Sequence, residues 1–531
     1  MSGLQESIAA GYKIIQDANL HDLSDTLECK LSNTSAILQK NLALATLIKP
    51  SILIKRQKAI IALRDQPRNA WEAHFSRIAE IEKNILPFFK KSSDEKDSLE
   101  DDAIAQLSFQ DDLCKPLNQV PWMICCIALF KVWVVPALTL MTPILAWIVP
   151  YILLKFVYAF PIEQQEYINV LQGMWVGNMG MPGGDIPDML SPRSIIQFVI
   201  FAISFIQGMV QPIQNAMHLN KTDTVIVGVG QKLVELRDFI RSMKTETSIS
   251  LTNALDEIDG NDYRRIFMLI KEQPERLHMA LRDLAELEIV WRFSLKIVFK
   301  PVIFKPAVFV LRQMVDISLK DGIPSSLALT ETTERHAVIT GPNGGGKSSF
   351  LRATLQSVLI GHSYGMAACE EAIMPRFKWI ASGLQLRDTP GRFSMFETEV
   401  KFAADCIRLA RLHKSPGLVL FDELFHSTNP PDGALSASIF LKQLWGADSN
   451  AFSVVSTHVF PLVEKKPKNV QAICCPATQN TDGTVSYSYK AEPGICKVSS
   501  VHMVWEKYGL TCGYAPAAKV SVSKRNTQDA I

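Results

Sequence analysis

A glycine-rich stretch between Thr340 and Phe350 has the residue types that bind phosphate groups. It fits the pattern G-x-x-x-x-G-K-[ST], in which a lysine and a hydroxyl follow the last glycine. Glycine lets the backbone curl so that successive N–H groups face phosphate oxygens. We expect Lys347 to contact the β- and γ-phosphates and the Ser348 hydroxyl to bind Mg²⁺. The expected nucleotide-binding residues of this stretch are Gly341, Pro342, Asn343, Gly344, Gly345, Gly346, Lys347, Ser348 and Ser349.

The neighbours of this stretch fit a phosphate-binding loop. The apolar residues 337–339 predict a strand before it, and a helix is expected to start near Ser348. Such a helix turns its positive N-terminus toward a bound anion. The alternative is a tight turn in which glycine serves only the backbone conformation. Such a turn needs neither a strand before it nor a helix after it, so these predicted neighbours favour the phosphate-binding loop.

Two further apolar runs end in polar residues that complete a hydrolysis site. Residues 418–421 lead to Asp422, expected to hold Mg²⁺, and to Glu423, expected to polarise the attacking water. Residues 452–455 lead to His458, which we expect to sense the γ-phosphate. A lone histidine more often has no such role, but three strand ends that meet at one sheet edge favour it. The predicted catalytic residues are Glu423, His458 and Lys347.

Together these motifs resemble the ATPase domain of the MutS family, the DNA mismatch-recognition ATPases. The resemblance rests on TGPNGGGKSSFLR, LVLFDEL, STNPPDG and STH, and it is strong over about residues 322–510. Upstream, residues 48–63 and 281–295 are similar to pieces of the family's helical core. The resemblance implies a C-terminal α/β P-loop NTPase domain of the ABC/MutS type, with ATP and Mg²⁺ as cofactors and ATP hydrolysis as the activity.

The resemblance also implies a dimer. Ser394, Phe396 and Glu399 match the family's S-x-F-x-x-E segment, with one extra residue between Arg392 and Ser394. In the family this serine completes the nucleotide site of the neighbouring subunit. Ser394 is therefore expected to act in trans, in a homodimer or with a related MutS-like subunit.

Outside the ATPase domain the chain departs from the family. No Phe-x-Glu reading motif occurs in the first hundred residues, and we expect no mismatch-reading domain. The apolar residues 116–220 stand where the family carries long levers and a DNA clamp. No helix-turn-helix tail is evident, and residues 513–531 are expected to be disordered. Double-stranded DNA remains an implied partner.

Residues 116–220 predict a helical hairpin in a lipid bilayer. Residues 132–154 and 194–220 carry no charge, each is framed by lysine or arginine, and each is long enough to span a bilayer. Residues 161–192 carry acids but no lysine or arginine, so the positive-inside rule places the loop 161–193 on the far side. The alternative is a pair of core helices in a soluble protein, because three prolines interrupt the first run.

Length, charge and cysteine content set broad limits. The 531 residues leave room for several domains, and a net charge of +2 indicates neither a nucleic-acid tail nor an acidic substrate. Ten cysteines without a C-x-x-C spacing indicate neither a zinc site nor a disulfide framework. The N-terminal residues carry acids and lack an apolar core, so no signal peptide is expected.

The expected domain order runs from a helical N-terminal half to the ATPase domain. The ranges are 1–115 (helical), 116–220 (two-span membrane insertion), 221–300 (helical), 301–512 (ATPase) and 513–531 (tail). We expect the protein at a membrane, with the ATPase domain in the cytosol or on a nucleus-facing side.

Two main functions fit these features. The first is a MutS-like, Mg²⁺-dependent ATPase that associates with DNA and is tethered to a membrane. The second is a membrane-embedded, ABC-type mechanochemical ATPase that acts on a non-DNA partner; no L-S-G-G-Q motif precedes the acidic strand, which argues against a transporter. A regulatory protein that binds nucleotide without turnover is a third reading, which the intact Lys347, Asp422 and Glu423 disfavour.

Overall fold

The chain forms two compact units. The computed structural model describes residues 2–89, 102, 104–120, 122–175, 192–246, 254–256, 258, 260–386, 393–479, 485–499, 504–505 and 508–510. The first unit comprises Met1–Trp71 and Ala285–Ile531, and the second comprises Glu72–Leu284. This division is coarser than the expected domain order, whose boundaries stay predictions. Residues 176–191 of the far-side loop and the whole tail 513–531 lie outside the described residues.

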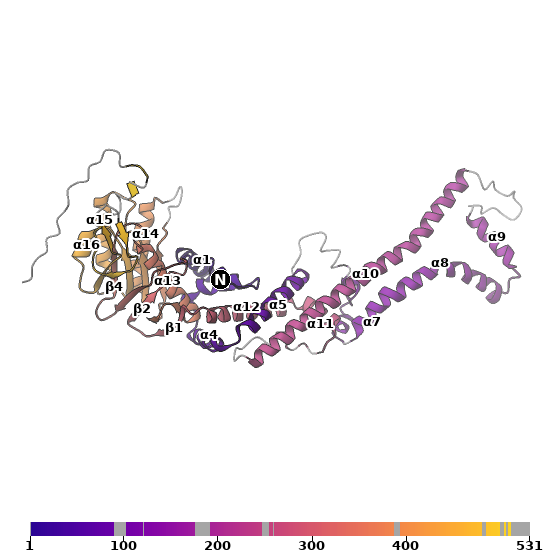
Figure 1. Cartoon of the computed structure of the whole chain (residues 1–531). Coiled ribbons are helices and arrows are strands. Elements are labelled where there is room, and N and C mark those ends of the chain that lie inside the picture. Colours follow the sequence, from indigo (N-terminus) through magenta and orange to yellow (C-terminus); the bar gives the residue numbers. More distant parts are fainter. Residues whose placement is uncertain are drawn as a thin grey trace, which may run out of the picture. The chain divides into compact units, whose positions relative to one another are not determined.

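The first unit contains a six-stranded sheet, whose strand β4 is labelled beside helix α13 in Figure 1. Within the described residues its order is β13-β10-β4-β9-β8-β7, and the β10, β4, β9, β8 and β7 strands are parallel. The strands are β4 (His336–Thr340), β7 (Trp379–Gly383), β8 (Gly417–Phe421), β9 (Ala451–Ser456), β10 (Val470–Cys474) and β13 (Glu492–Pro493). The three apolar runs of the sequence form β4, β8 and β9, which are buried throughout, as parallel strands covered on both faces should be.

The first unit also contains a second sheet. Its order in the described part of the chain is β3-β2-β6-β1-β5. The strands are β1 (Phe299–Phe304), β2 (Val308–Met314), β3 (Ser325–Thr330), β5 (Met366–Ala368) and β6 (Glu371–Met374), and a short ribbon pairs β11 (Ala477–Gln479) with β12 (Val485–Tyr487). Helix α13 (Lys347–Tyr364) contacts strands of both sheets and is buried along most of its length.

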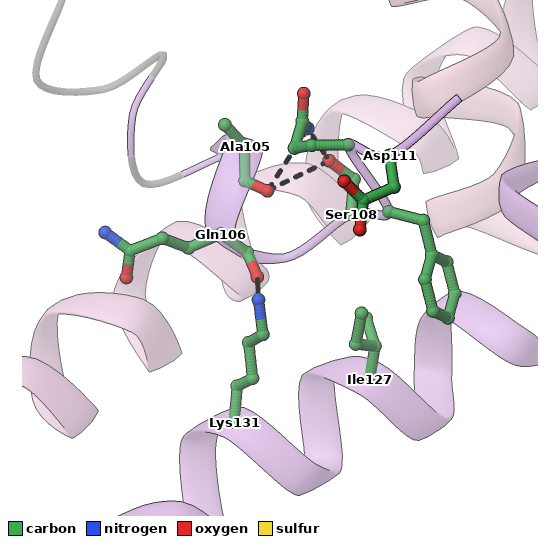
Figure 2. A pocket seen from close by; sticks show the side chains of 8 residues that line it. Ala105, Gln106, Ser108, Asp111, Ile127 and Lys131 are labelled. Carbon is green, nitrogen blue, oxygen red and sulfur yellow. Dashed lines mark hydrogen bonds between the residues drawn. The ribbon is translucent and has the colours of Figure 1, made fainter. Parts of the chain in front are cut away.

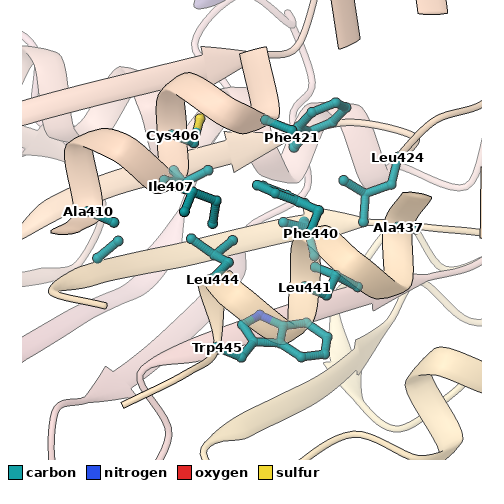
Figure 3. Close-up of a cluster of buried hydrophobic side chains, with 14 of the residues drawn as sticks. Cys406, Ile407, Ala410, Phe421, Leu424, Ala437, Phe440, Leu441, Leu444 and Trp445 are labelled. Atoms are coloured by element: carbon teal, nitrogen blue, oxygen red, sulfur yellow. The ribbon is translucent and has the colours of Figure 1, made fainter. Parts of the chain in front are cut away.

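Helices α14 (Met395–Leu412), α15 (Pro430–Leu444) and α16 (Phe460–Glu464) belong to the same unit. Figure 3 shows Cys406, Ile407 and Ala410 of α14 gathered with Phe440 and Leu444 of α15 in one buried apolar cluster. Apolar area removed from water in this cluster stabilises the contact of these helices with the sheet.

The first helices of the chain also pack in this unit. They are α1 (Ser2–Asp17), α2 (Leu23–Thr26), α3 (Thr34–Ala43) and α4 (Pro50–Ala62). The Gln356 side chain of α13 donates to the Ala18 carbonyl at 2.9 Å, and Asn41 donates to the Tyr364 hydroxyl at 2.8 Å. The N-terminal helices are therefore fixed to the helix that follows the glycine-rich loop.

The second unit is helical. Its helices are α7 (Met123–Leu129), α8 (Val135–Ile152), α9 (Gln164–Trp175), α10 (Pro192–Glu246) and α11 (Tyr263–Glu272). The sequence boundaries of the two units fall within α5 (Arg68–Ile85) and α12 (Pro274–Leu295). Helix α10 contacts both α8 and α11. Turns of π-helix at Phe130–Val134 and Leu153–Val157 flank α8, so residues 123–157 form one continuous helix with local irregularities.

One apolar helix of this unit overlaps the predicted membrane insertion. In the described part of the chain, one stretch, Met123–Thr142, is long and apolar enough to cross a bilayer, with a mean hydropathy of 2.2 and 17% of it buried. Ile148–Val157 is a shorter apolar helix. The predicted span 132–154 overlaps both, whereas many side chains of the predicted span 194–220 lie outside the described residues. The hairpin therefore stays a prediction.

The lysines that frame the first predicted span have protein partners. Lys131 donates to the Gln106 carbonyl beside an open pocket of about 420 Å³ (Figure 2). Lys155 donates to the Tyr151 hydroxyl at 2.8 Å. Both ammonium groups therefore have hydrogen-bond acceptors inside the second unit.

Candidate nucleotide-binding and hydrolysis site

The glycine-rich loop connects β4 to α13 at the carboxyl end of the parallel sheet. Two of its glycines are required by the backbone. Gly341 has a φ of 149°, and a Cβ there would lie 2.8 Å from the Cys475 carbonyl oxygen. Gly346 has a φ of 104° and is the N-cap residue of α13, a conformation that residues with side chains rarely adopt. The loop thus leads directly into a helix N-terminus, which favours anions.

The ammonium group of Lys347 lies within this loop. It donates to the carbonyls of Gly341 at 3.0 Å and Pro342 at 3.1 Å, and to the Asn343 side-chain oxygen at 3.3 Å. Burial lowers the pKa of Lys347, while the nearby carboxylates of Glu423 and Asp422 act in the opposite direction. A phosphate anion beside Lys347 would likewise favour the charged form.

Ser348 and Asp422 meet at the start of α13. The Ser348 hydroxyl donates to Asp422 Oδ2 at 2.5 Å, and the Ser456 hydroxyl donates to the other oxygen, Oδ1. A carboxylate beside hydroxyl groups is a set of hard oxygen donors, which suits Mg²⁺. No role was predicted for Ser456, although it is the first residue of the STH segment that contains His458.

Glu423 and His458 form a pair next to this group. His458 Nε2 lies 3.5 Å from Glu423 Oε1. The hydrogen bond with His458 lowers the pKa of Glu423, and burial opposes that shift. Glu423 is therefore ionised at neutral pH, as a proton acceptor must be. The structure thus brings Lys347, Ser348, Asp422, Glu423 and His458 together at the ends of β4, β8 and β9.

Ser394 has a local structural contact. Its hydroxyl accepts a hydrogen bond from the Glu397 amide at 3.2 Å, and the Glu397 carboxylate accepts one from the Ser394 amide at 3.0 Å. This reciprocal capping box starts α14. Ser394 is exposed, and its role across a dimer stays a prediction; Arg392, in the same segment, lies outside the described residues.

A pocket of about 310 Å³ adjoins the loop. Gly346, Ser349 and Phe350 line one part of it, and Ile323 and Tyr489 line another. An apolar and aromatic lining with a few polar groups suits the flat face of a nucleoside base. No role was predicted for Ile323 or Tyr489, because neither belongs to the glycine-rich loop or to the polar strand ends.

Comparisons with known proteins match the part of the chain that carries this site. Residues 337–514 match MutS domain V. The chain is 30% identical over 194 residues to DNA mismatch repair protein MSH1, mitochondrial, of Arabidopsis thaliana, which covers 35% of this chain and 17% of that protein. It is 26% identical over 258 residues to DNA mismatch repair protein MutS of Streptococcus sanguinis, which covers 45% of this chain and 29% of that protein. The matched part thus spans less than a third of the length of either relative.

Proposed function

We propose that this chain is a Mg²⁺-dependent ATP hydrolase with a P-loop fold. The premise is its membership of the MutS family through residues 337–514. One observation carries the proposal. The loop lysine, a hydroxyl beside a carboxylate, and an ionised glutamate meet at the ends of three neighbouring parallel strands. Ligands of α/β sheets bind at this edge.

Each residue of the site has a role in hydrolysis. Backbone N–H groups of the loop and the Lys347 ammonium bind the phosphates, while Ser348 and Asp422 hold Mg²⁺. Mg²⁺, when bound, neutralises charge that develops on the phosphate oxygens. Glu423 accepts the proton of the attacking water. His458 senses the γ-phosphate and, through its contact with Glu423, orients the Glu423 carboxylate. Ser394 of one protomer completes the site of its partner in a dimer.

We further propose that the protein associates with double-stranded DNA. The similar proteins are named DNA mismatch repair proteins, and they do not favour the alternative of an ATPase that acts on a non-DNA partner. The DNA contact is proposed as a contact with phosphates, because no Phe-x-Glu reading motif occurs in the first hundred residues.

Binding to a fluorescent DNA duplex should depend steeply on salt. Each phosphate neutralised releases counterions, so about six contacts would weaken binding by about 10³-fold between about 50 and 200 mM salt. The measurement is the fluorescence anisotropy of the labelled duplex with the detergent-solubilised full chain. An uncharged dextran that carries the same dye serves as the control probe. Absence of binding at the lowest salt would contradict DNA association and favour the non-DNA alternative.

We also propose that residues 116–220 tether the protein to a bilayer, with the ATPase domain in the cytosol or on a nucleus-facing side. Supporting this, Trp133 and Phe156 are 65% and 73% exposed on the continuous helix 123–157. Many other large apolar side chains of this helix are exposed too. Soluble monomers rarely expose so large an apolar surface without a partner.

Two single cysteines should report opposite sides of the membrane. In a background without native cysteines, Gln165→Cys lies in the predicted far-side loop and Ser51→Cys lies in the first unit, and both positions are exposed. An impermeant thiol reagent added to sealed vesicles should label one position from outside and the other only after the vesicles are opened. Labelling of both positions from the same side would contradict the hairpin.

A further inference from the structure

A buried carboxylate of α14 lies beside the turn that carries Glu423. Glu399 is 1% exposed, and carboxylates are rarely buried without a specific partner. Its Oε2 accepts a hydrogen bond from the Ser427 hydroxyl. Its Oε1 makes no hydrogen bond within the described part of the chain but lies 3.1 Å from His426 Nδ1. Glu399 thus faces two consecutive residues that follow the acidic pair.

His426 joins Glu399 to the backbone of Glu423. Its Nδ1 is hydrogen-bonded to the Glu423 carbonyl oxygen at 3.0 Å. A carbonyl only accepts, so Nδ1 carries the proton in this contact. The protonated nitrogen therefore lies between the Glu423 carbonyl and the negative charge of Glu399. Removal of that charge removes the electrostatic attraction that holds the imidazole beside Glu423.

The turn needs such support because its backbone is unfavourable. Glu423 and Phe425 have φ values of 51° and 50°, in the left-handed region that residues with side chains rarely adopt. On the β9 side, the Ser456 hydroxyl accepts from the Glu423 amide at 2.7 Å and the Ser456 carbonyl accepts from the Leu424 amide at 3.2 Å. On the α14 side, Glu399 provides the matching support.

We propose that Glu399 is a positioning residue for ATP hydrolysis, which acts through His426 on the turn that carries Glu423. The inference rests on the proposed function, in which Glu423 activates water. Ser394 is the N-cap residue of helix α14, so a partner subunit that contacts Ser394 acts on Glu423 through a single helix. Glu399 then sets the rate of turnover and leaves the affinity for ATP unchanged.

Glu399→Gln tests this role, because it keeps the shape of the side chain and removes its charge. The value of kcat should fall by about ten- to a hundredfold, since small misplacements of a catalytic group cost rates of that order. The KM for ATP should change by less than about twofold. His426→Leu should cause a similar loss, whereas His426→Asn should keep most activity because its amide N–H replaces Nδ1–H.

Two features keep the test decisive. The His426 side chain is 53% exposed, so its variants should fold even where Glu399→Gln is unstable. The double variant Glu399→Gln/His426→Leu should be no slower than either single variant, because both remove one shared contact. Glu464→Gln, which removes a carboxylate of an exposed ion pair with Lys497, serves as the control and should retain full activity.

The outcomes separate the two proposals. A wild-type protein without turnover overturns the proposed function and the positioning role with it. Active wild-type protein together with full kcat in both Glu399→Gln and His426→Leu overturns only the positioning role. A raised KM with unchanged kcat also overturns it, because that result places Glu399 in ATP binding.

Discussion

Glu423→Gln should stop ATP turnover and leave Mg²⁺-ATP bound. The substitution keeps the size of the side chain but removes the ionised oxygen that, in the proposed mechanism, accepts the proton of the attacking water. General base catalysis contributes about 10²- to 10⁴-fold, so kcat should fall by at least about a hundredfold. Lys347, Ser348 and Asp422 keep their contacts with one another and with the loop, so the affinity for a fluorescent ATP analogue should be unchanged.

Phosphate release and analogue binding measured on the same preparation check this expectation. The control is Glu371→Gln, which removes a carboxylate of the same type whose partner is Arg312 on the second sheet. The control should hydrolyse ATP at the wild-type rate. Equal turnover in Glu423→Gln and wild type would remove Glu423 from the chemical step.

The residues of the site could be located from the sequence because three different strands end in them. The apolar runs before Gly341, Asp422 and His458 have the composition of buried parallel strands. Parallel neighbours place their carboxyl ends together, and β4, β9 and β8 are neighbours in the observed order. The contact of Ser348 with Asp422 follows from that order.

Contacts that depend on tertiary packing could not be predicted from the sequence. Nothing in the spacing of Glu399 indicates that its carboxylate faces Ser427 and His426, because the contact joins a helix to a loop 28 residues away. The attachment of the N-terminal helices to α13 is of the same kind, since Gln356 and Ala18 lie 338 residues apart. Side-chain hydrogen bonds over such separations leave no local periodicity to detect.

The apolar helix 123–157 shows a different limit. Charge-free length predicted a helix at residues 132–154, and the observed helix extends back to Met123 with a π-turn at Phe130–Val134. Local irregularity of this kind follows from prolines and packing, which a hydropathy window averages away. The family match over residues 337–514 confirms the resemblance of the C-terminal domain, and it does not include residues 123–157.

Lys347→Ala should abolish nucleotide binding as well as turnover. The Lys347 ammonium is the positive side chain held within the loop by the Gly341 and Pro342 carbonyls. Its loss leaves the phosphate charge to backbone N–H groups and the helix N-terminus alone. Affinity for the ATP analogue should fall by at least about a hundredfold, since a charge-assisted contact in a desolvated site is lost. Binding equal to wild type would contradict the assignment of this loop.

The same variant tests whether sites are shared across a dimer. Ser394→Asp keeps a residue that caps helices well, so α14 is preserved while a carboxylate faces the partner's phosphates. Each variant alone should be inactive. In a mixed dimer, one site combines Lys347 of the Ser394→Asp chain with Ser394 of the Lys347→Ala chain, and that site is intact. Mixing should therefore restore about a quarter of wild-type activity with random subunit exchange, and activity should rise with protein concentration. No recovery on mixing, with mixed dimers shown by tagged co-purification, would mean that each protomer completes its own site.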